Sequence, residues 1–432
     1  MSIEIVGLTI IIVMFILMFL RVPLSVAMGV PAILGIIYLR GWETTLSTVE
    51  TIVWSNSFSY TLTTIPLFIF MGQFLHSAGL TKELFNTFRK WFGKIRGGLA
   101  LATVGSSALL AAASGSSVAT TGTMGVVAPK EMLKSGYNKT LAGGSVIAGG
   151  SLGILIPPST SFILYGMLTD QSIGKLFTAG LLPGIILMIF YMIAVLVIVK
   201  LKPDFAPGFE QSTWSEKLKS LKNTIWILIL FLVVIGGIYL GWFSPTEASG
   251  IGAIGAFLIA LVRKKLTFKN FKEATFETVR TTGFLFAVLL SAFLLNYVLV
   301  ITRLPNILGD VISSSSLSPT MIFILLILMY LVLGAIMDTT AMIVVTIPII
   351  LPLVEMMGWD LIWFGVIIVL LIEMALMSPP IGINCFVLDG VAKDLKLGNI
   401  FKGAMIFAIP ILVLIAVLYI MPNIALYLPN TM

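Results

Sequence analysis

Long apolar stretches separated by short polar segments run through the whole chain. A hydrocarbon core about 30 Å thick is crossed by a helix of about 20 apolar residues. With that length as the measure, the pattern predicts ten membrane-crossing helices, at residues 3–20, 24–39, 55–79, 139–169, 175–199, 223–241, 247–262, 281–301, 360–388 and 401–428. The expected fold class is therefore an all-α polytopic membrane protein.

Two further apolar regions, residues 97–136 and 319–357, are each long enough for two helices but are interrupted near the middle. The interruptions are residues 114–117 and 337–340, which we call the first tip and the second tip. Each region is either two full crossings or one re-entrant helical hairpin. The tips are short and carry no basic residue, which favours a buried turn. Two re-entrant hairpins are therefore predicted.

Composition narrows the class of protein. Hydrophobic residues make up 58% of the chain and charged residues only 10%, whereas soluble proteins are about 25% charged. Too little polar surface is left for a soluble enzyme, a disordered protein or a nucleic-acid-binding protein. The single His76 and the single Cys385 also exclude a histidine-cluster or cysteine-cluster metal centre.

The basic residues indicate the orientation of the chain, because Lys and Arg stay on the cytoplasmic side of a membrane. If both interrupted regions are hairpins, 23 of the 26 Lys and Arg residues fall on one side, and only Arg40, Lys175 and Arg303 fall on the other. This predicts that both termini face the periplasm or the extracellular space. The basic segment 82–96 fits an amphipathic helix along the membrane surface. Its charges have two explanations that stay open on the sequence: binding of anionic lipid head groups, or membrane topology alone.

Proline landmarks recur at a constant spacing, which indicates an internal repeat. Pro23 and Pro245 are 222 residues apart, and so are the double prolines at 157–158 and 379–380. The two interrupted regions fall at the same spacing. A chance match of several landmarks in one order is improbable, so the chain is predicted to contain two related halves.

The predicted halves are residues 1–200 and 223–432, joined by a cytoplasmic linker at residues 201–222. Each half contains five crossings and one hairpin, and an odd number of crossings inverts the second half relative to the first. The first half holds helices 1–3, the hairpin 97–136, the broken helix 139–169 and the helix 175–199; the second holds the hairpin 319–357 and the broken helix 360–388. Inverted repeats with interrupted helices are typical of secondary transporters.

The double prolines break two of the predicted helices, at residues 149–160 (the first break) and 375–384 (the second break). Non-helical backbone persists at membrane depth only where protein buries it or where it lines a cavity. Proline interrupts the helical hydrogen bonds, so free carbonyl oxygens and the partially positive N-termini of helices meet at each break. The oxygens suit Na⁺, and the N-termini suit an anion.

Four motifs carry a family resemblance. They are GSSVAT at residues 115–120 leading to PKEM at 129–132, AGGSLGILIPPS at 148–159, MDTTA at 337–341, and IEMALMSPPIG at 372–382. Together they resemble the large membrane (permease) subunit of tripartite ATP-independent periplasmic (TRAP) transporters, the DctM-like family within the ion transporter superfamily. The resemblance runs nearly from end to end.

The resemblance implies a sodium-driven elevator rather than an enzyme, with no cofactor besides sodium ions as coupling ions. A transport domain of two hairpins and two broken helices would slide against a scaffold. The substrate would be an organic acid, such as a C4-dicarboxylate or sialic acid, delivered by an extracytoplasmic binding protein. A separate small four-helix membrane subunit is implied as a further partner, in the cytoplasmic membrane of a bacterium or archaeon.

The resemblance also implies site residues at the tips and breaks. One sodium site would be formed by Ser114, Ser116, Ser117, Gly153, Ile156 and Pro158. A second would be formed by Gly334, Asp338, Thr339, Ala375, Ser378 and Ile381, where Ala375 and Ser378 replace the Gly and Thr often seen in the family. The substrate carboxylate would meet Ser116, Thr120, Thr160, Thr339, Thr340 and Asn384.

Several alternatives stay open on the sequence. Asp338 either binds sodium or caps the following helix, and one residue can do both. Glu373 lies in an apolar helix, where an ionisable group suggests proton or cation binding, although a structural hydrogen-bond anchor is the favoured alternative. His76 is expected to pack at an interface. The rival function is a stand-alone sodium/carboxylate symporter of related fold.

Overall fold

The computed structural model of the chain describes residues 2–206, 212–314 and 317–432, which form helices and connecting turns without a strand. The first half contains α1 (Ile3–Phe19), α2 (Leu24–Arg40), α3 (Trp42–Ser57), α4 (Thr64–Ser77), α5 (Leu80–Phe92), α6 (Gly98–Ser114), α7 (Ser117–Lys134), α8 (Lys139–Ser151), α9 (Thr160–Thr169) and α10 (Ile173–Leu201). The second half contains α11 (Trp214–Tyr239), α12 (Pro245–Val262), α13 (Phe268–Ile301), α14 (Leu304–Ser314), α15 (Pro319–Leu333), α16 (Thr339–Met356), α17 (Leu361–Met377), α18 (Ile383–Val391), α19 (Leu397–Ile420) and α20 (Asn423–Leu426). The all-α class is confirmed.

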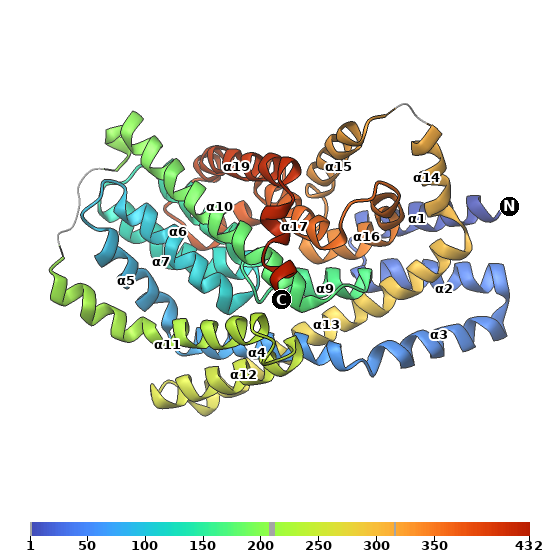
Figure 1. Ribbon diagram of the computed structural model, residues 1–432, viewed down its shortest axis with the longest axis horizontal. Helices are drawn as coiled ribbons and strands as arrows, with labels where there is room; N and C mark the ends of the chain where they lie inside the picture. Colours follow the sequence, from blue (N-terminus) through green and yellow to red (C-terminus); the bar gives the residue numbers. More distant parts are fainter. Residues whose placement is uncertain (1, 207–211, 315–316) are drawn as a thin grey trace.

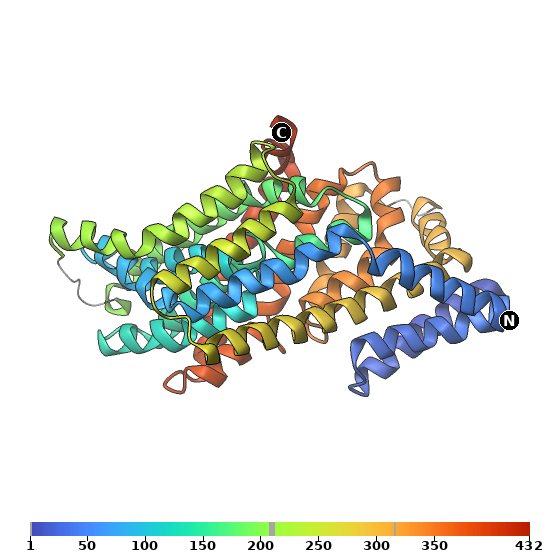
Figure 2. The same cartoon turned by 90° about the horizontal axis from the view of Figure 1, so that it is seen from below.

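The helices form an elongated bundle with the N-terminus at one end of its long axis and the C-terminus near its middle (Figures 1 and 2). The pair α6–α7 lies to one side of α17, and the pair α15–α16 lies to the other (Figure 1). The interrupted elements α8–α9 and α17–α18 pack between these pairs, since α8 contacts α6 and α7 while α17 contacts α15 and α16. The first break is thus buried inside the bundle, whereas Pro379, Pro380 and Ile381 of the second break are exposed.

The order of elements is the same in both halves. In each half a helix pair corresponding to the predicted hairpin precedes a broken helix and then a long helix, α10 or α19. The helix starts also match, because Pro23 directly precedes α2 and Pro245 is the first residue of α12. The division at residues 200 and 223, and the inverted orientation of the halves, stay predictions.

The third crossing differs from the predicted helix at residues 55–79. It is a pair of helices, with the axes of 42–57 and 60–77 bent by 56°. The apolar pattern did not predict α3, because this helix contains polar residues such as Glu43 and Glu50. The break between α3 and α4 lies at Phe58 and Ser59.

Other boundaries shift because capping, rather than hydropathy, decides where a helix begins or ends. The predicted linker is partly helical: α11 begins at Trp214 with a capping box between Thr213 and Glu216, and hydrogen bonds from Thr213 hold the pKa of Glu216 below its usual value. Residues 207–211 of that linker lie outside the described residues. The helix predicted at 281–301 begins at Phe268, and the last long helix ends at Ile420 rather than at 428.

Five helices are long and apolar enough to cross a membrane alone within the described ranges: α10, α12, α13, α16 and α19. Two bent pairs, α3–α4 and the two parts of α11, raise the number to as many as seven. The remaining apolar helices have 10–17 residues and include α1, α2, α6, α9, α15 and α17. The chain therefore has several apolar spans, and ten crossings stay a prediction.

Glycine allows a close contact between the helices α8 and α19. A Cβ at Gly144 would lie 2.9 Å from the Cα of Gly403, and a Cβ at Gly403 would lie 2.3 Å from the carbonyl oxygen of Thr140. No other residue type permits backbones to approach this closely. This contact fixes α8, and with it the first break, against the second half of the chain.

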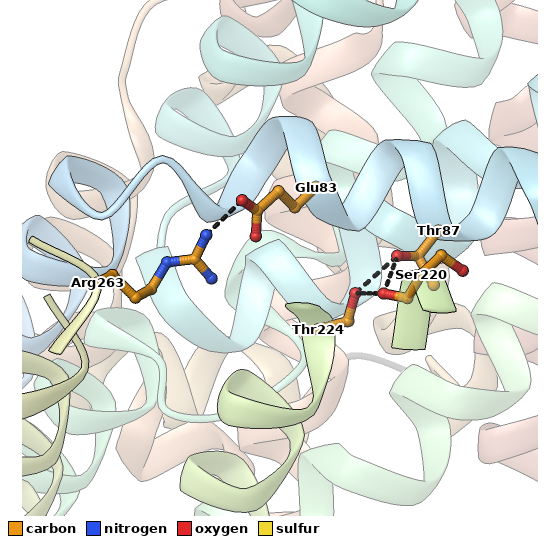
Figure 3. A network of polar contacts seen from close by, with 5 residues as sticks. All are labelled: Glu83, Thr87, Ser220, Thr224 and Arg263. Atoms are coloured by element: carbon orange, nitrogen blue, oxygen red, sulfur yellow. Dashed lines mark hydrogen bonds and ion pairs between the residues drawn. The ribbon is translucent and has the colours of Figure 1, made fainter. Parts of the chain in front are cut away.

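A polar network ties α5 to the second half (Figure 3). The Thr87 hydroxyl donates to the carbonyl oxygen of Ser220 at 3.1 Å and shares a hydrogen bond of 2.7 Å with Thr224, both on α11. Glu83 forms an ion pair with Arg263 at the end of α12. The amphipathic helix predicted at 82–96 thus exists as α5, but its apolar side is buried in protein, because it packs on α6 and α11.

Candidate substrate and cation site

The first tip is a tight turn between α6 and α7. Gly115 has a left-handed backbone (φ 59°) that ends α6, and Ser116 caps α7 by accepting a hydrogen bond from the Ala119 amide at 3.3 Å. A Cβ on Gly115 would lie 2.8 Å from the carbonyl oxygen of Pro158. Glycine is therefore required at this position both for its backbone angle and for the close approach of the tip to the first break.

Hydroxyl groups fix the shape of the first tip. The Ser114 and Thr120 hydroxyls lie 2.7 Å apart, and Thr120 donates to the carbonyl oxygen of Ser116 at 2.8 Å. Thr160, the first residue of α9, donates to the carbonyl oxygen of Gly115 at 3.2 Å. These bonds hold the tip and the break together as one polar unit.

The structure brings most of the predicted first sodium residues together. A Cβ on Gly153 would lie 2.6 Å from the carbonyl oxygen of Ser116 and 2.7 Å from the Cα of Ser117, so the backbones of the tip and the break touch. The Ser117 and Ser159 hydroxyls are buried without a hydrogen-bond partner among the described residues. Ile156 packs its side chain toward Gly184 of α10, which leaves only its backbone for a ligand.

The second tip is built differently. Asp338 caps α16 by accepting a hydrogen bond from the Ala341 amide at 2.8 Å, so the capping role is confirmed and its sodium role stays a prediction. Gly334 touches the second break, since a Cβ there would lie 2.2 Å from the Cβ of Ala375. Ser378 donates its hydroxyl to the Met374 carbonyl oxygen at 2.6 Å. Ile381 is 41% exposed, in contrast with the buried first break.

A cavity of about 410 Å³ is lined by residues of both tips. Its walls come from five separated parts of the chain: α4, the first tip with the adjoining turns of α6 and α7, the start of α9, α13, and the second tip. The polar lining residues are Gln73, His76, Ser114, Ser116, Thr123, Thr160, Thr281 and Thr340. None of the described residues that line this cavity is an acid, a lysine or an arginine.

Three of the six predicted substrate residues line this cavity: Ser116, Thr160 and Thr340. Thr120 is fully buried, and its hydroxyl donates a hydrogen bond within the first tip. Thr339 is the first residue of α16, next to Thr340. Asn384 is fully buried, and neither of its amide atoms has a hydrogen-bond partner among the described residues. Thr120, Thr339 and Asn384 are not among the lining residues.

Sequence reasoning missed Gln73 and Thr281 and expected His76 to pack at an interface, whereas all three line the cavity. They lie on α4 and α13, far along the chain from both tips. Polar residues within apolar helices were the only signal that could have identified them.

Comparisons with known proteins agree over most of the chain. The family model described as "Tripartite ATP-independent periplasmic transporter, DctM component" matches residues 11–424. The C4-dicarboxylate TRAP transporter large permease protein DctM of Pseudomonas aeruginosa is 33% identical over 88% of each chain. The sialic acid large permease protein SiaM of Vibrio cholerae is 30% identical over 86% of this chain and 87% of its own.

A third relative and a solved structure extend the comparison. The 2,3-diketo-L-gulonate TRAP transporter large permease protein YiaN of Escherichia coli is 30% identical over 84% of this chain and 85% of its own. The YdaH transporter of Alcanivorax borkumensis shares the fold, with a TM-score of 0.66 over 98% of both chains at 13% identity.

Proposed function

Because this chain belongs to the DctM family of TRAP transporter large permeases, we propose that it drives sodium-coupled uptake of an organic acid by an elevator movement. The family consists of membrane transporter subunits, not enzymes. It implies a multi-pass protein of the inner membrane that works with a small membrane subunit and a binding protein. The substrate, the coupling ion and the mechanism are the proposal.

The cavity lined by both tips carries this proposal. Three helices place a residue from their N-terminal ends in its wall: α7 through Ser116, α9 through Thr160 and α16 through Thr340. Helix N-termini carry partial positive charge and free amide donors. A carboxylate can therefore be held by backbone and hydroxyl donors without a lysine or arginine.

Lining chemistry limits the class of substrate. Hydroxyls, the Gln73 amide and the His76 imidazole can bind the remaining polar groups of a small organic acid. The relatives are named for C4-dicarboxylate, sialic acid and 2,3-diketo-L-gulonate, and each of these substrates carries a carboxylate. A small, polar organic acid is the class that suits the cavity.

The first tip and first break support the sodium site of the proposal. Carbonyl oxygens of Ser116 and Pro158 face the contact between them, and the Ser117 hydroxyl has no partner among the described residues. A hard cation is bound by such oxygens. Sodium binding there would hold the tip on the break, and the tip is also a wall of the cavity, so binding of the ion and of the acid would be coupled.

The arrangement of the helices supports the proposed elevator movement. The two tips and two breaks belong to elements that pack on one another, α7 on α8 and α16 on α9, which supports their moving as one unit. The same order of elements in both halves supports an inverted repeat. In this proposal α5 connects the moving unit to α11 and α12 through the network of Figure 3.

The test is uptake by proteoliposomes that contain the chain with its small subunit and its binding protein. Radiolabelled succinate and radiolabelled sialic acid serve as probes, with an inward sodium gradient or none. We expect uptake of at least one acid that needs both the gradient and the binding protein. Uptake without the binding protein would favour the stand-alone symporter, and uptake without sodium would refute the coupling.

Thr160→Val tests the cavity itself. It removes one hydroxyl from the wall and one hydrogen bond to the tip, a loss of about 1 kcal/mol, so we expect the KM of uptake to rise about fivefold. The matched control is Thr275→Val on α13, where an exposed hydroxyl bonds only to its own helix. An unchanged KM in Thr160→Val would argue against the cavity as the substrate site.

A further inference from the structure

Three polar residues of the cavity wall lie outside the tips and the breaks: Gln73 and His76 of α4, and Thr281 of α13. We call them the α4–α13 group. The cavity residues of α4, at positions 69, 72, 73 and 76, have the spacing of one helix face, and so do those of α13, at positions 281, 284 and 285. Each of the two helices therefore lines the cavity with one face, and the α4–α13 group lies on these faces.

Other contacts of α4 hold this face in place. The Thr64 and Thr246 hydroxyls share a buried hydrogen bond of 2.9 Å between α4 and α12. The ring centroid of Phe74 lies 5.4 Å from that of Phe257 on α12 and 6.1 Å from that of Phe271 on α13. Aromatic pairs at these distances stabilise helix packing. The α4–α13 group is thus carried by helices that are packed on each other, as a selective binding wall requires.

The side chains of the α4–α13 group are available to a ligand, because none of them forms a hydrogen bond with another described residue. Two other hydroxyls of the cavity are already engaged within the protein. Ser116 accepts a hydrogen bond from the Ala119 amide, and Thr160 donates one to the Gly115 carbonyl oxygen. The α4–α13 group therefore offers the cavity hydrogen-bonding capacity that the fold itself does not use.

This capacity distinguishes between kinds of organic acid. A glutamine amide and a neutral imidazole each carry donors and an acceptor, and a threonine hydroxyl does both. A substrate hydroxyl can accept from these donors and donate to these acceptors, whereas a carboxylate can only accept. A second carboxylate at this wall would leave the acceptors unpaired, which costs free energy. It would also meet no lysine or arginine among the described lining residues.

We propose that the α4–α13 group makes this chain selective for organic acids with one carboxylate and several hydroxyl groups, over dicarboxylates of the same length. This inference rests on the proposed function and names the substrate class of the same cavity. The helix N-termini at the tips and at the start of α9 hold the carboxylate. The α4–α13 group binds hydroxyls at the other end of the acid. Selectivity thus comes from two helices that contain none of the four family motifs.

Ligand binding to the purified chain with its small subunit, in a buffer that contains sodium, tests the selectivity directly. Gluconate, a hydroxylated acid with one carboxylate, is compared with adipate, a dicarboxylate with the same number of carbon atoms and no hydroxyl. Isothermal titration calorimetry gives both dissociation constants. We expect gluconate to bind at least about tenfold more tightly, because a site built to bond substrate hydroxyls rejects an analogue without them. Equal affinities, tighter binding of adipate, or no binding of gluconate overturns the proposal.

Substitutions assign the selectivity to this wall. Thr281→Val and Gln73→Leu each remove hydrogen-bonding groups at nearly constant size, so each should weaken gluconate binding about fivefold and change adipate binding less than about twofold. Thr281→Ser keeps the hydroxyl and should keep the gluconate affinity. The matched control is Thr275→Val, which removes an exposed hydroxyl of α13 that bonds only to its own helix. If Gln73→Leu does not fold, Thr281→Val with its serine counterpart gives the same test.

His76→Gln separates hydrogen bonding from charge. Glutamine cannot become charged but still donates and accepts, so the preference for gluconate should persist in this variant. Loss of the preference in a His76→Gln protein of normal thermal stability overturns the proposal, because a charged imidazole would then be the selective group. Gluconate affinity that is unchanged in both Thr281→Val and Gln73→Leu overturns it as well.

The binding measurement needs no transport, so its outcome is separate from that of the proposed function. Uptake that needs no sodium or no binding protein would refute the proposed function and leave the measured binding preference intact. Uptake that needs both, by a chain that binds adipate as tightly as gluconate, would refute the selectivity alone.

Discussion

Replacing Gly115 by alanine should weaken sodium binding without disturbing the rest of the fold. The new Cβ would lie 2.8 Å from the carbonyl oxygen of Pro158. An ordinary contact begins near 3.4 Å, so the first tip must move about 0.6 Å away from the first break. That displacement acts on the place where the two backbones supply carbonyl oxygens to the proposed ion.

The magnitude has two parts. A side chain with the left-handed backbone of Gly115 costs roughly 1–2 kcal/mol, and relief of the close contact costs about 1–2 kcal/mol more. Only the second part depends on the contact between tip and break. At about 1.4 kcal/mol per tenfold change in affinity, we expect the sodium concentration for half-maximal uptake to rise about tenfold.

Gly358→Ala is the matched control. Gly358 has a similar left-handed angle, φ 66°, and no atom within 4 Å of the added Cβ, so it carries the backbone strain without the contact. The assay is uptake against sodium concentration, with thermal unfolding of both variants. A normal sodium dependence in Gly115→Ala would refute the reasoning, and so would an equal shift in Gly358→Ala, because strain alone would then explain the effect.

Three further predictions concern the second tip and the packing. Asp338→Asn should keep the cap on α16, whereas Asp338→Ala should lose about 1 kcal/mol of stability. If Asp338 also binds sodium, Asp338→Asn should raise the sodium concentration that uptake requires even though the cap is kept. An unchanged sodium requirement in Asp338→Asn limits the residue to capping. Gly403→Ala forces α19 away from α8 and should lower the Tm by several degrees. Gly398→Ala, whose added Cβ would have no atom within 4 Å, should leave the Tm unchanged. An equal Tm in the two variants would contradict the close contact between α8 and α19. Thr87→Val removes two hydrogen bonds to α11, worth about 1 kcal/mol each, and should lower the Tm by a few degrees, a loss that an unchanged melting curve would exclude.

The tips and breaks could be predicted from the sequence, because they depend on the local conformational preferences of a few neighbouring residues. Glycine at position 115 permits the left-handed turn, and Ser116 and Asp338 cap the helices that follow them. The double prolines mark the breaks, which the structure places between α8 and α9 and between α17 and α18. Each of these features depends on residues a few positions apart, so sequence alone predicted them.

Helix boundaries were less predictable where polarity and helix formation disagree. The helix α3 is polar enough to escape a search for apolar stretches. The start of α11 depends on a capping box within the expected linker. Hydropathy reports where a helix can meet lipid, whereas capping and tertiary packing decide where it begins.

Tertiary structure alone decided the composition of the cavity and the surroundings of Glu373. Gln73, His76 and Thr281 join the two tips only because α4 and α13 pack beside them. The sequence identified Glu373 as an acid in an apolar helix. The full burial of its carboxyl, without a hydrogen-bond partner among the described residues, depends on which helices pack on α17. Periodicity, turns and caps depend on residues that are close together in the sequence, so the sequence alone predicts them. The desolvation of a carboxyl and the convergence of helix N-termini depend on which distant helices pack together, and only the folded structure fixes that.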